Sequence, residues 1–236
     1  MVKKKIYLSA STQQDNIGVA GYGSEEKNMF ILRDRIEYFM KIGGHGSDFE
    51  IHKNKDKKMT LTEIVADSNN KKVDLHVANH TNAGPSKVRG CEVYYHYKNT
   101  GNGKRFAYLW YSEISAVTPT TDRGVRKDNT VYESGNCLYE TSKTTGDAAL
   151  CEHIYHTNEE DVKFFTTNVD LFAIGTAKAI YRLYDYKFVI SGGPLDWKTI
   201  IRNESKWADL YIRELEKNMK ETGYNWPGLI QKIKYD

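Results

Sequence analysis

The hydrophobic and polar positions of the chain predict strands and helices that alternate from the N-terminus onward. A short β-rich run, KIYLS (residues 5–9), leads into a polar, glycine-rich loop. The first helix is predicted after this loop from apolar residues at helical spacing, namely Met29, Leu32, Ile36, Phe39 and Met40. Acidic residues open this segment and Gly43-Gly44 closes it, as expected for the two ends of a helix.

The same pattern continues to about residue 186. Further strands are predicted at FEIH (49–52), VDLHVANH (73–80), CEVYYHY (91–97) and AALCEHI (148–154). Helices are predicted at 59–70, at 105–117 and, as one broken helix or two consecutive ones, at 158–186. Residues 118–147 are rich in Thr, Gly, Asp and Asn and are predicted to be irregular or lightly stranded. The alternation favours an α/β fold, with a twisted, mostly parallel sheet of about six strands flanked by helices.

The sequence pattern changes from alternating strands and helices to helices alone after Ser191, which predicts a second, smaller unit. Gly192-Gly193-Pro194 is a boundary signal, and the following segment has a helical pattern. We therefore expect one domain over 1–190 and a small C-terminal helical appendage over 191–236. Its tryptophans, Trp197, Trp207 and Trp226, either grip a sugar polymer or pack on other protein surface. Packing is favoured, because large apolar residues on short helices are usually buried.

Charge, cysteines and hydropathy narrow the class of protein. The net charge of +3 is too weak to argue for nucleic acid and mildly favours an anionic surface. Cys91, Cys137 and Cys151 are expected to be reduced core thiols rather than a disulfide framework or a CxxC zinc site, since their number is odd, their spacing is wide and their neighbours are apolar. The N-terminus lacks the apolar segment of a signal peptide, and no apolar run is long enough to span a bilayer. We expect synthesis in the cytoplasm and no membrane partner, while the oligomeric state stays open.

Two residues at predicted strands are candidates for chemistry. His80 ends a strand, at the edge of a parallel sheet where functional groups collect. His76 lies on the same face but about 13 Å away along the strand, too far to share one ion with His80. Glu152 lies among apolar residues, where an unpaired carboxylate is costly. The structural alternatives are a satisfied strand-end histidine and a carboxylate paired with an arginine.

Several segments, in order, resemble the zinc-dependent N-acetylmuramoyl-L-alanine amidases, the type found in endolysins and sporulation lysins. DLHVANHTNAG with GCEVYYHY (residues 74–97) resembles the family's strand S-I-H-A-N-A followed by G-x-E-V-Y-Y. LCEHIYHTNEED (150–161) resembles L-V-E-x-G-F-x-T-N-x-x-D, and Arg123-Gly124-Val125 resembles R-G-V. Glu25 resembles the acidic residue that opens the first helix. The resemblance runs from about residue 5 to residue 186.

The resemblance implies a function and three site residues. His80 and Glu25 would be zinc ligands, and Glu152 would be the catalytic carboxylate. The reaction would be hydrolysis of the amide between N-acetylmuramic acid and L-alanine in peptidoglycan by a zinc-activated water. The carboxylate would take the proton of the water and pass one to the leaving amine. Without a signal peptide, the enzyme would reach the cell wall only after release from the cytoplasm.

The chain departs from the family at the first zinc ligand. The family has a histidine in D-P-G-H-G after the first strand, where this chain reads LSASTQQDN. We expect Gln13 to supply the third ligand, with Thr12, Gln14 and Asp15 as alternatives. His45, in a similar Gly-Gly-His-Gly run, follows the first helix and is expected to be structural.

Two other functions are weighed, and the missing histidine supports the first of them. One is a catalytically inactive, amidase-like module that binds the cell wall. The other is an unrelated hydrolase that uses Cys151 with His153 or His156.

Overall fold

A six-stranded sheet forms the centre of the fold. The computed structural model describes residues 2–55, 59–99, 101–119 and 122–190. The strands are β1 (Lys4–Ala10), β2 (Phe49–Lys53), β3 (Leu75–Asn82), β4 (Cys91–Tyr95), β5 (Asp122–Lys127) and β6 (Asp147–Tyr155). Their order in the sheet is β2-β1-β3-β6-β4-β5. All pairs are parallel except β4 with β6, which confirms the predicted mostly parallel α/β sheet.

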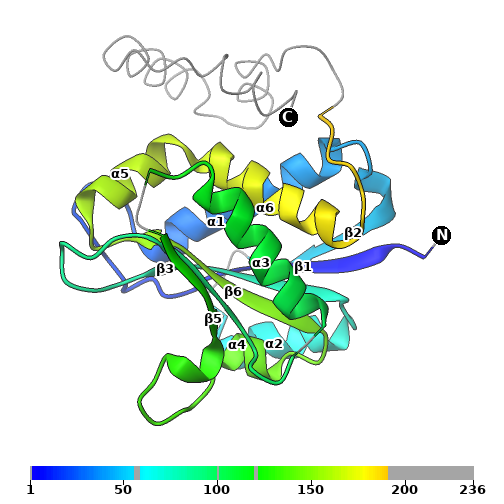
Figure 1. Ribbon diagram of the computed structural model, residues 1–236, viewed down its shortest axis with the longest axis horizontal. Coiled ribbons are helices and arrows are strands. Elements are labelled where there is room, and N and C mark those ends of the chain that lie inside the picture. The colour runs from blue at the N-terminus through cyan, green and yellow to red at the C-terminus, as the bar shows by residue number, and fades with distance from the viewer. Residues whose placement is uncertain (1, 56–58, 100, 120–121, 191–236) are drawn as a thin grey trace. The chain divides into compact units, whose positions relative to one another are not determined.

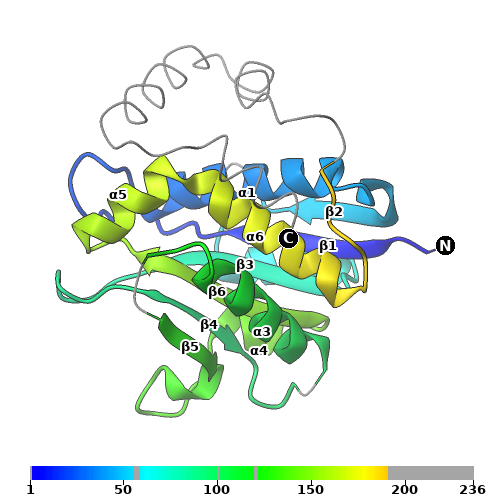
Figure 2. The same ribbon diagram turned by 45° about the horizontal axis from the view of Figure 1, so that its top comes forward.

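Helices cover both faces of this sheet (Figures 1 and 2). One face carries α1 (Glu25–Ile42), α3 (Asn102–Ser115) and α6 (Val169–Leu183), which pack on one another. The other face carries α2 (Leu61–Asn70) and the short α4 (Tyr139–Lys143). The remaining elements are α5 (Glu159–Thr167) and the 3-10 turns η1 (Gly46–Asp48) and η2 (Asp128–Thr130). The central strands are therefore enclosed on both sides, as is usual for parallel sheets.

The two faces of the sheet differ in chemistry. The face under α1, α3 and α6 is apolar and includes Ile6, Leu8 and Val77, all fully buried. The opposite face also buries polar groups, including Ser9 and His76, neither of which is exposed to solvent. Buried polar side chains need hydrogen-bond partners, and here α2 and α4 supply them. Ser68 of α2 lies 2.9 Å from Nδ1 of His76, and Glu140 of α4 binds its other ring nitrogen.

The structure confirms most of the predicted elements and refines two of them. The predicted helix over 105–117 begins earlier, at Asn102, and the predicted final helix is two helices, α5 and α6. The segment over 118–147 contains the edge strand β5 and the helix α4. The second of these was not predicted, because α4 has only five residues and no apolar repeat.

The chain separates by its internal contacts into two units, Met1–Phe188 and Val189–Asp236. The predicted appendage over 191–236 lies outside the described residues, so the division at residue 190 stays a prediction. In the part of the chain that the structure describes, no helix is long and apolar enough to cross a membrane. All three cysteines are free thiols, and Cys91 and Cys151 are buried as expected, whereas Cys137 is partly exposed because it lies in the polar segment before α4.

Candidate active site

Register across three strands aligns one histidine and two carboxylates. His80 of β3 pairs with Glu152 of β6, and Glu152 pairs in turn with Glu92 of β4. Directly paired residues project from the same face of a sheet, so these three side chains form a row across it. The row lies on the face covered by α2 and α4, toward the carboxyl end of β3, where open α/β sheets bind their ligands.

Glu25 reaches His80 from the first residue of α1. Ser24 caps this helix by accepting a hydrogen bond from the amide of Lys27, which fixes where the helix begins. Glu25 Oε1 then lies 3.1 Å from Nδ1 of His80. Burial alone would raise the pKa of Glu25, but its hydrogen bonds with His80, Asn16 and Ser11 outweigh burial and lower it. Glu25 is therefore an ionised, buried carboxylate that faces the histidine.

A second carboxylate holds the opposite side of the histidine ring. Glu140 Oε2 lies 2.8 Å from Nε2 of His80. Its Oε1 lies 3.0 Å from Nε2 of His76 and accepts a 2.7 Å hydrogen bond from the hydroxyl of Ser9. Burial would raise the pKa of Glu140, but the bonds to both histidines hold it far below its usual value. One ionised carboxylate thus fixes the orientation of two neighbouring histidine rings.

His80 has its ring nitrogens shared between two anions. Burial alone would lower its pKa, but the hydrogen bonds and charges of Glu140 and Glu25 outweigh burial and raise the pKa well above its usual value. In the metal-free protein the ring is therefore an imidazolium between two carboxylates. A cation bound beside Nδ1 would displace the proton on that nitrogen and leave Nε2 donating to Glu140.

Glu152 differs from these two carboxylates because it lacks a compensating partner. Its Oε2 is buried and has no hydrogen-bond partner among the described residues. Burial raises its pKa to about 8, and the nearby charges of Glu25, Glu92 and Glu140 add to the rise against the opposing charge of His80. A carboxyl group with a pKa near neutrality can both accept and donate a proton at working pH.

The neighbouring arginines bind Glu92. Arg126 Nε lies 3.2 Å and Arg123 Nε 3.6 Å from the carboxylate of Glu92, which is buried. Glu92 also accepts a 3.0 Å hydrogen bond from the hydroxyl of Tyr155. The ion pair with an arginine that was the structural alternative for Glu152 is formed instead by Glu92, its partner across the strands.

The loop after β1 approaches Glu25 through other residues than the predicted ligand. Asn16 Nδ2 donates to Glu25 Oε2 at 2.7 Å and also to Gln13 Oε1 at 2.8 Å. Gln13 is exposed and is separated from Glu25 by this one amide group. Thr12 turns elsewhere, since its hydroxyl donates to the carbonyl of Met59 at 2.6 Å. Gln14 and Asp15 are exposed.

The structure brings together three of the four predicted site residues, His80, Glu25 and Glu152. Sequence reasoning missed Glu140, Asn16, Ser11 and Glu92. Glu92 stands within the quoted GCEVYY segment, so its position in a buried strand was a signal that it had a role. Glu140 gave no such signal, because it lies in a polar segment without periodicity.

The surroundings of His45 and of Cys151 favour a structural role for both residues rather than a catalytic one. His45 Nδ1 lies 3.0 Å from Asp48 in the turn after α1, and its ring stacks on Tyr186, in agreement with the structural role expected for it. The thiol of Cys151 is buried, and burial raises its pKa well above the usual value. Burial, followed by the charge of His80, lowers the pKa of His153 to about 3. A protonated thiol beside a neutral, enclosed histidine does not favour a cysteine hydrolase.

The donor atoms of His80 and Glu25 fit a zinc ion. Two ligand atoms of a tetrahedral site with bonds of about 2.0 Å stand about 3.3 Å apart. Nδ1 of His80 and Oε1 of Glu25 are 3.1 Å apart. A histidine nitrogen with a carboxylate on its far side is also the usual arrangement around catalytic zinc. The residues present therefore fit a zinc ion, with Nδ1 of His80 and Oε1 of Glu25 as two donor atoms.

Comparison with known proteins identifies a family that this chain matches. The family model described as N-acetylmuramoyl-L-alanine amidase matches residues 6–182. A curated relative, the uncharacterized protein YqiI of Bacillus subtilis (strain 168), is 28% identical over 127 residues. That match covers 53% of this chain and 61% of YqiI, so the chain spans less than two thirds of that relative.

Solved structures share the fold at low sequence identity. The catalytic domain of CwlV, an N-acetylmuramoyl-L-alanine amidase from Bacillus (Paenibacillus) polymyxa var. colistinus, is 22% identical, with a TM-score of 0.67 over 78% of this chain and 99% of that one. The N-acetylmuramoyl-L-alanine amidase of Clostridium difficile 630 is 18% identical, with a TM-score of 0.67 over 79% and 100%. The catalytic domain of the CD27L endolysin is 17% identical, with a TM-score of 0.58 over 77% and 98%.

The family match spans most of the described fold, from β1 to the end of α6, and includes the strands and helices that carry Glu25, His80 and Glu152. It confirms the resemblance seen in the sequence, the fold class and the enzyme class. This chain belongs to the N-acetylmuramoyl-L-alanine amidase family.

Proposed function

We propose that this chain hydrolyses the amide between the lactyl group of N-acetylmuramic acid and the L-alanine of the peptidoglycan stem, with Zn²⁺ held by His80, Glu25 and Gln13. The observation that carries the proposal is the row of His80 and Glu152 across two paired strands, with Glu25 against His80 at 3.1 Å. This arrangement sets two metal donors beside a carboxyl group that can exchange protons. The family match supports the choice of substrate.

Glu152 is the proton carrier of this proposal. Zinc, when bound, would polarise the amide carbonyl and lower the pKa of a water at the open position. Glu152 accepts the proton of the attacking water and delivers it to the nitrogen of the leaving L-alanine, because an amine leaves readily only when protonated. Its pKa of about 8 in the metal-free protein reflects a carboxyl group that is not tied up in an ion pair.

Glu140 and Glu25 set the state of His80. Glu140 accepts the Nε2 proton, so Nδ1 is the nitrogen left for a metal, and Glu25 lies on that same side. Glu140 does not touch the substrate in this proposal and acts as a positioning residue. Its second bond, to His76, anchors the carboxylate from the other oxygen.

Gln13 is proposed as the third ligand through its side-chain carbonyl oxygen. Its Oε1 is joined to Glu25 through the amide of Asn16, so a modest shift of the loop would bring it to the same ion. A neutral oxygen is a weaker donor than imidazole. Gln13→Ala should therefore weaken zinc binding, and Gln13→His should strengthen it while the fold is kept. If Gln13→Ala binds zinc as the parent does, Asp15 is the next residue to test.

The place of action follows from the substrate. We propose that the chain acts on the cell wall after release from the cytoplasm, as a phage endolysin or a sporulation lysin does. Peptidoglycan is the proposed partner.

Product analysis tests the proposal directly. Digestion of purified peptidoglycan with the zinc-loaded chain should expose free L-alanine amines and leave the number of reducing sugar ends unchanged. Glu152→Gln should keep its zinc and lose about 10²–10⁴-fold in rate, since the amide cannot take the proton. New reducing ends would mean a glycosidase and would refute the proposal.

A second candidate, an inactive wall-binding module, draws on the ion pairs of His80. Each ring nitrogen of His80 pairs with a carboxylate oxygen, from Glu25 or from Glu140. These ion pairs do not require a metal. In that case the purified chain would bind wall fragments, hold no zinc after dialysis against a zinc buffer, and release no L-alanine amine.

A further inference from the structure

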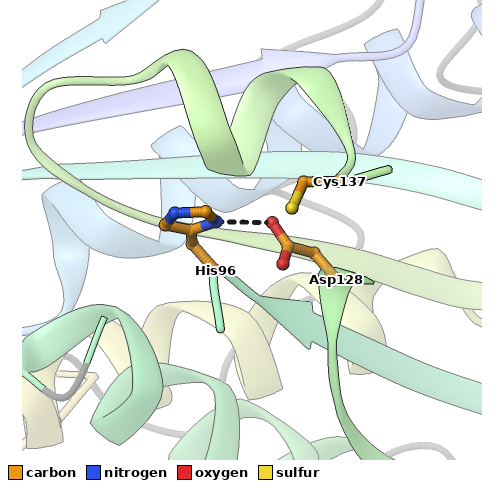
Figure 3. A group of neighbouring side chains, drawn as sticks. All are labelled: His96, Asp128 and Cys137. Atoms are coloured by element: carbon orange, nitrogen blue, oxygen red, sulfur yellow. Dashed lines mark hydrogen bonds and ion pairs between the residues drawn. The ribbon is translucent and has the colours of Figure 1, made fainter. Parts of the chain in front are cut away.

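A group of three potential metal ligands lies apart from the amidase site. His96 follows the end of β4, Asp128 opens η2, and Cys137 comes shortly before α4. One ligand atom from each lies within 4.8 Å of the other two. In Figure 3 the ring of His96 and the sulfur of Cys137 both point toward the carboxylate of Asp128. The three residues come from separate segments of the chain and converge on one point.

This group does not overlap the site around His80. Tyr95, next to His96, pairs with Ala149, which lies three residues before Glu152 on β6. Three residues of a strand span about 10 Å. A cation held by His96 would thus lie toward the opposite end of the sheet strands from the row of His80 and Glu152.

Both carboxylate oxygens of Asp128 take part in hydrogen bonds, and Oδ1 accepts from the backbone amide of Tyr97 at 3.1 Å. Asp128 is fully buried, and its Oδ2 lies 2.9 Å from Nδ1 of His96 and accepts a 2.7 Å bond from the hydroxyl of Thr141. The Thr141 hydroxyl has a second acceptor, the carbonyl of Leu138 at 3.0 Å, so it can release Asp128 without losing all its bonds. His96 and Cys137 are partly exposed, which gives an ion a route in from solvent.

We propose that His96, Asp128 and Cys137 form a second metal site, for a thiolate-binding divalent cation such as Zn²⁺. The donor set of one imidazole nitrogen, one carboxylate oxygen and one sulfur suits zinc, whereas calcium and magnesium prefer oxygen alone. The thiolate and the carboxylate together balance the two positive charges of the ion. Three protein ligands leave a fourth position for water.

Binding at this site releases the thiol proton. Burial raises the pKa of Cys137, and the charge and hydrogen bond of Asp128 add to the rise against the weaker influence of Lys98 and Lys143. A metal bound here would take the place of the thiol proton.

The position of the site connects it with the segment that carries Glu140. Glu140 stands three residues after Cys137, and the adjacent Thr141 is bonded to Asp128. A cation at this site would join the end of β4 to the start of α4, and so would fix the element from which Glu140 holds His80.

Cobalt spectroscopy tests the proposal without use of the enzyme activity, so its result is independent of the proposed function. Co²⁺ added to the full, metal-free chain should give a near-ultraviolet thiolate-to-cobalt band, which the sulfur-free ligands His80, Glu25 and Gln13 cannot produce. Cys137→Ser should abolish the band, while the matched control Asn136→Ser, at an exposed neighbour, should keep it. A band that survives in Cys137→Ser would overturn the proposal, because it would come from another cysteine.

Thiol protection provides the same test on the unaltered chain. Cys137 is the partly exposed cysteine, while Cys91 and Cys151 are buried. An aromatic disulfide reagent should modify Cys137 about tenfold more slowly when free Zn²⁺ is about tenfold above its dissociation constant, since only the metal-free fraction reacts. Equal rates with and without Zn²⁺, together with no cobalt band, would mean a hydrogen-bonded cluster without a metal.

Discussion

The two carboxylates beside His80 favour both a protonated ring and a ring that binds a metal. Glu25 and Glu140 stabilise an imidazolium when no metal is present. The same two carboxylates present Nδ1 toward Glu25 and hold Nε2 when a metal replaces the proton. Metal binding and protonation of His80 are therefore in competition, and zinc affinity should fall as the pH is lowered.

The contribution of Glu140 to zinc binding can be measured with an isosteric change. Glu140→Gln keeps the shape of the side chain but removes the negative charge that orients and polarises His80. Loss of such a partner typically costs 10–100-fold in metal affinity. We expect a loss of about that size in a competition titration against a chromophoric chelator. The exposed Glu133 lies in the preceding loop, and Glu133→Gln is the matched control that should not change the affinity. An unchanged affinity in Glu140→Gln would remove the positioning role.

Glu152 should make the stability of the metal-free protein fall as the pH rises. Its pKa is about 8 in the folded protein, against an ordinary value of 4.5. Below about pH 4.5 both states are protonated, and there is no penalty. Between these values the unfolded chain ionises while the folded chain keeps the proton, so the free energy of unfolding declines with rising pH, by on the order of 3 kcal/mol at neutrality.

Glu152→Gln removes this penalty, because an amide does not titrate. After chelator treatment, its melting temperature at pH 7.5 should exceed that of the parent by roughly 10 °C. At pH 4.5 the two proteins should melt together. A difference that is the same at both pH values would mean that the variant acts through packing, and that Glu152 is ionised in the fold.

The sequence identified the residues of the site that stand in regular elements. His80 and Glu152 lie in apolar strands whose carboxyl-side position was visible in the sequence, and Glu25 opens a helix with a clear apolar stripe. Glu140, Asn16 and Ser11 were not identified, because their role depends on which loop and which short helix fold over the sheet. That arrangement is set by long-range contacts, such as Ser9 to Glu140 at 2.7 Å, which no local pattern records.

At the scale of the elements, the loop after β1 contacts the residue that follows β6. The amide of Val19 donates to the carbonyl of His156 at 3.1 Å. Gly18 approaches the same carbonyl so closely that an added Cβ would lie 1.9 Å from its oxygen. A backbone contact of this kind cannot yield as a flexible side chain would. The loop with Gln13 and Asn16 can therefore approach the backbone at His156 this closely only because residue 18 is a glycine.

Gly18→Ala should release this loop and weaken zinc binding while the rest of the fold stays intact. The added methyl group pushes the loop away from His156, and with it Asn16 and Gln13 move relative to Glu25. We expect lower zinc affinity, and faster proteolysis or hydrogen exchange limited to residues 11–24. Ala20→Ser, at an exposed position in the same loop, is the control. Normal zinc affinity in Gly18→Ala would show that the loop supplies no ligand.

The strands and helices that were predicted correctly have strong local patterns of apolar residues. β1, β3 and β6 are buried on both faces and therefore read as apolar runs, and α1 shows a full helical stripe between two clear ends. β5 and α4 lie at the edge of the sheet and in a polar segment, where packing against β4 and β6 rather than composition decides the structure. The antiparallel direction of β4 also had no local signal.

At the scale of the whole molecule, residues 1–188 include helices that cover both faces of the sheet. Helices from this unit pack on both faces, and the buried core includes Trp110, Phe172 and Tyr181 of α3 and α6. Each strand of the sheet and each residue of the candidate site lies within it. A chain that stops after this unit therefore has a complete core.

Deletion of residues 193–236 tests the predicted division of the chain. The shortened chain should fold cooperatively, with the circular dichroism of an α/β protein, because its core is complete. We expect its melting temperature to be several degrees lower, since Trp197, Trp207 and Trp226 are predicted to pack on protein surface, which removes apolar area from water. Sedimentation with insoluble peptidoglycan provides the contrasting readout. An unchanged melting temperature with weakened sedimentation would mean that the tryptophans bind the wall polymer instead of packing.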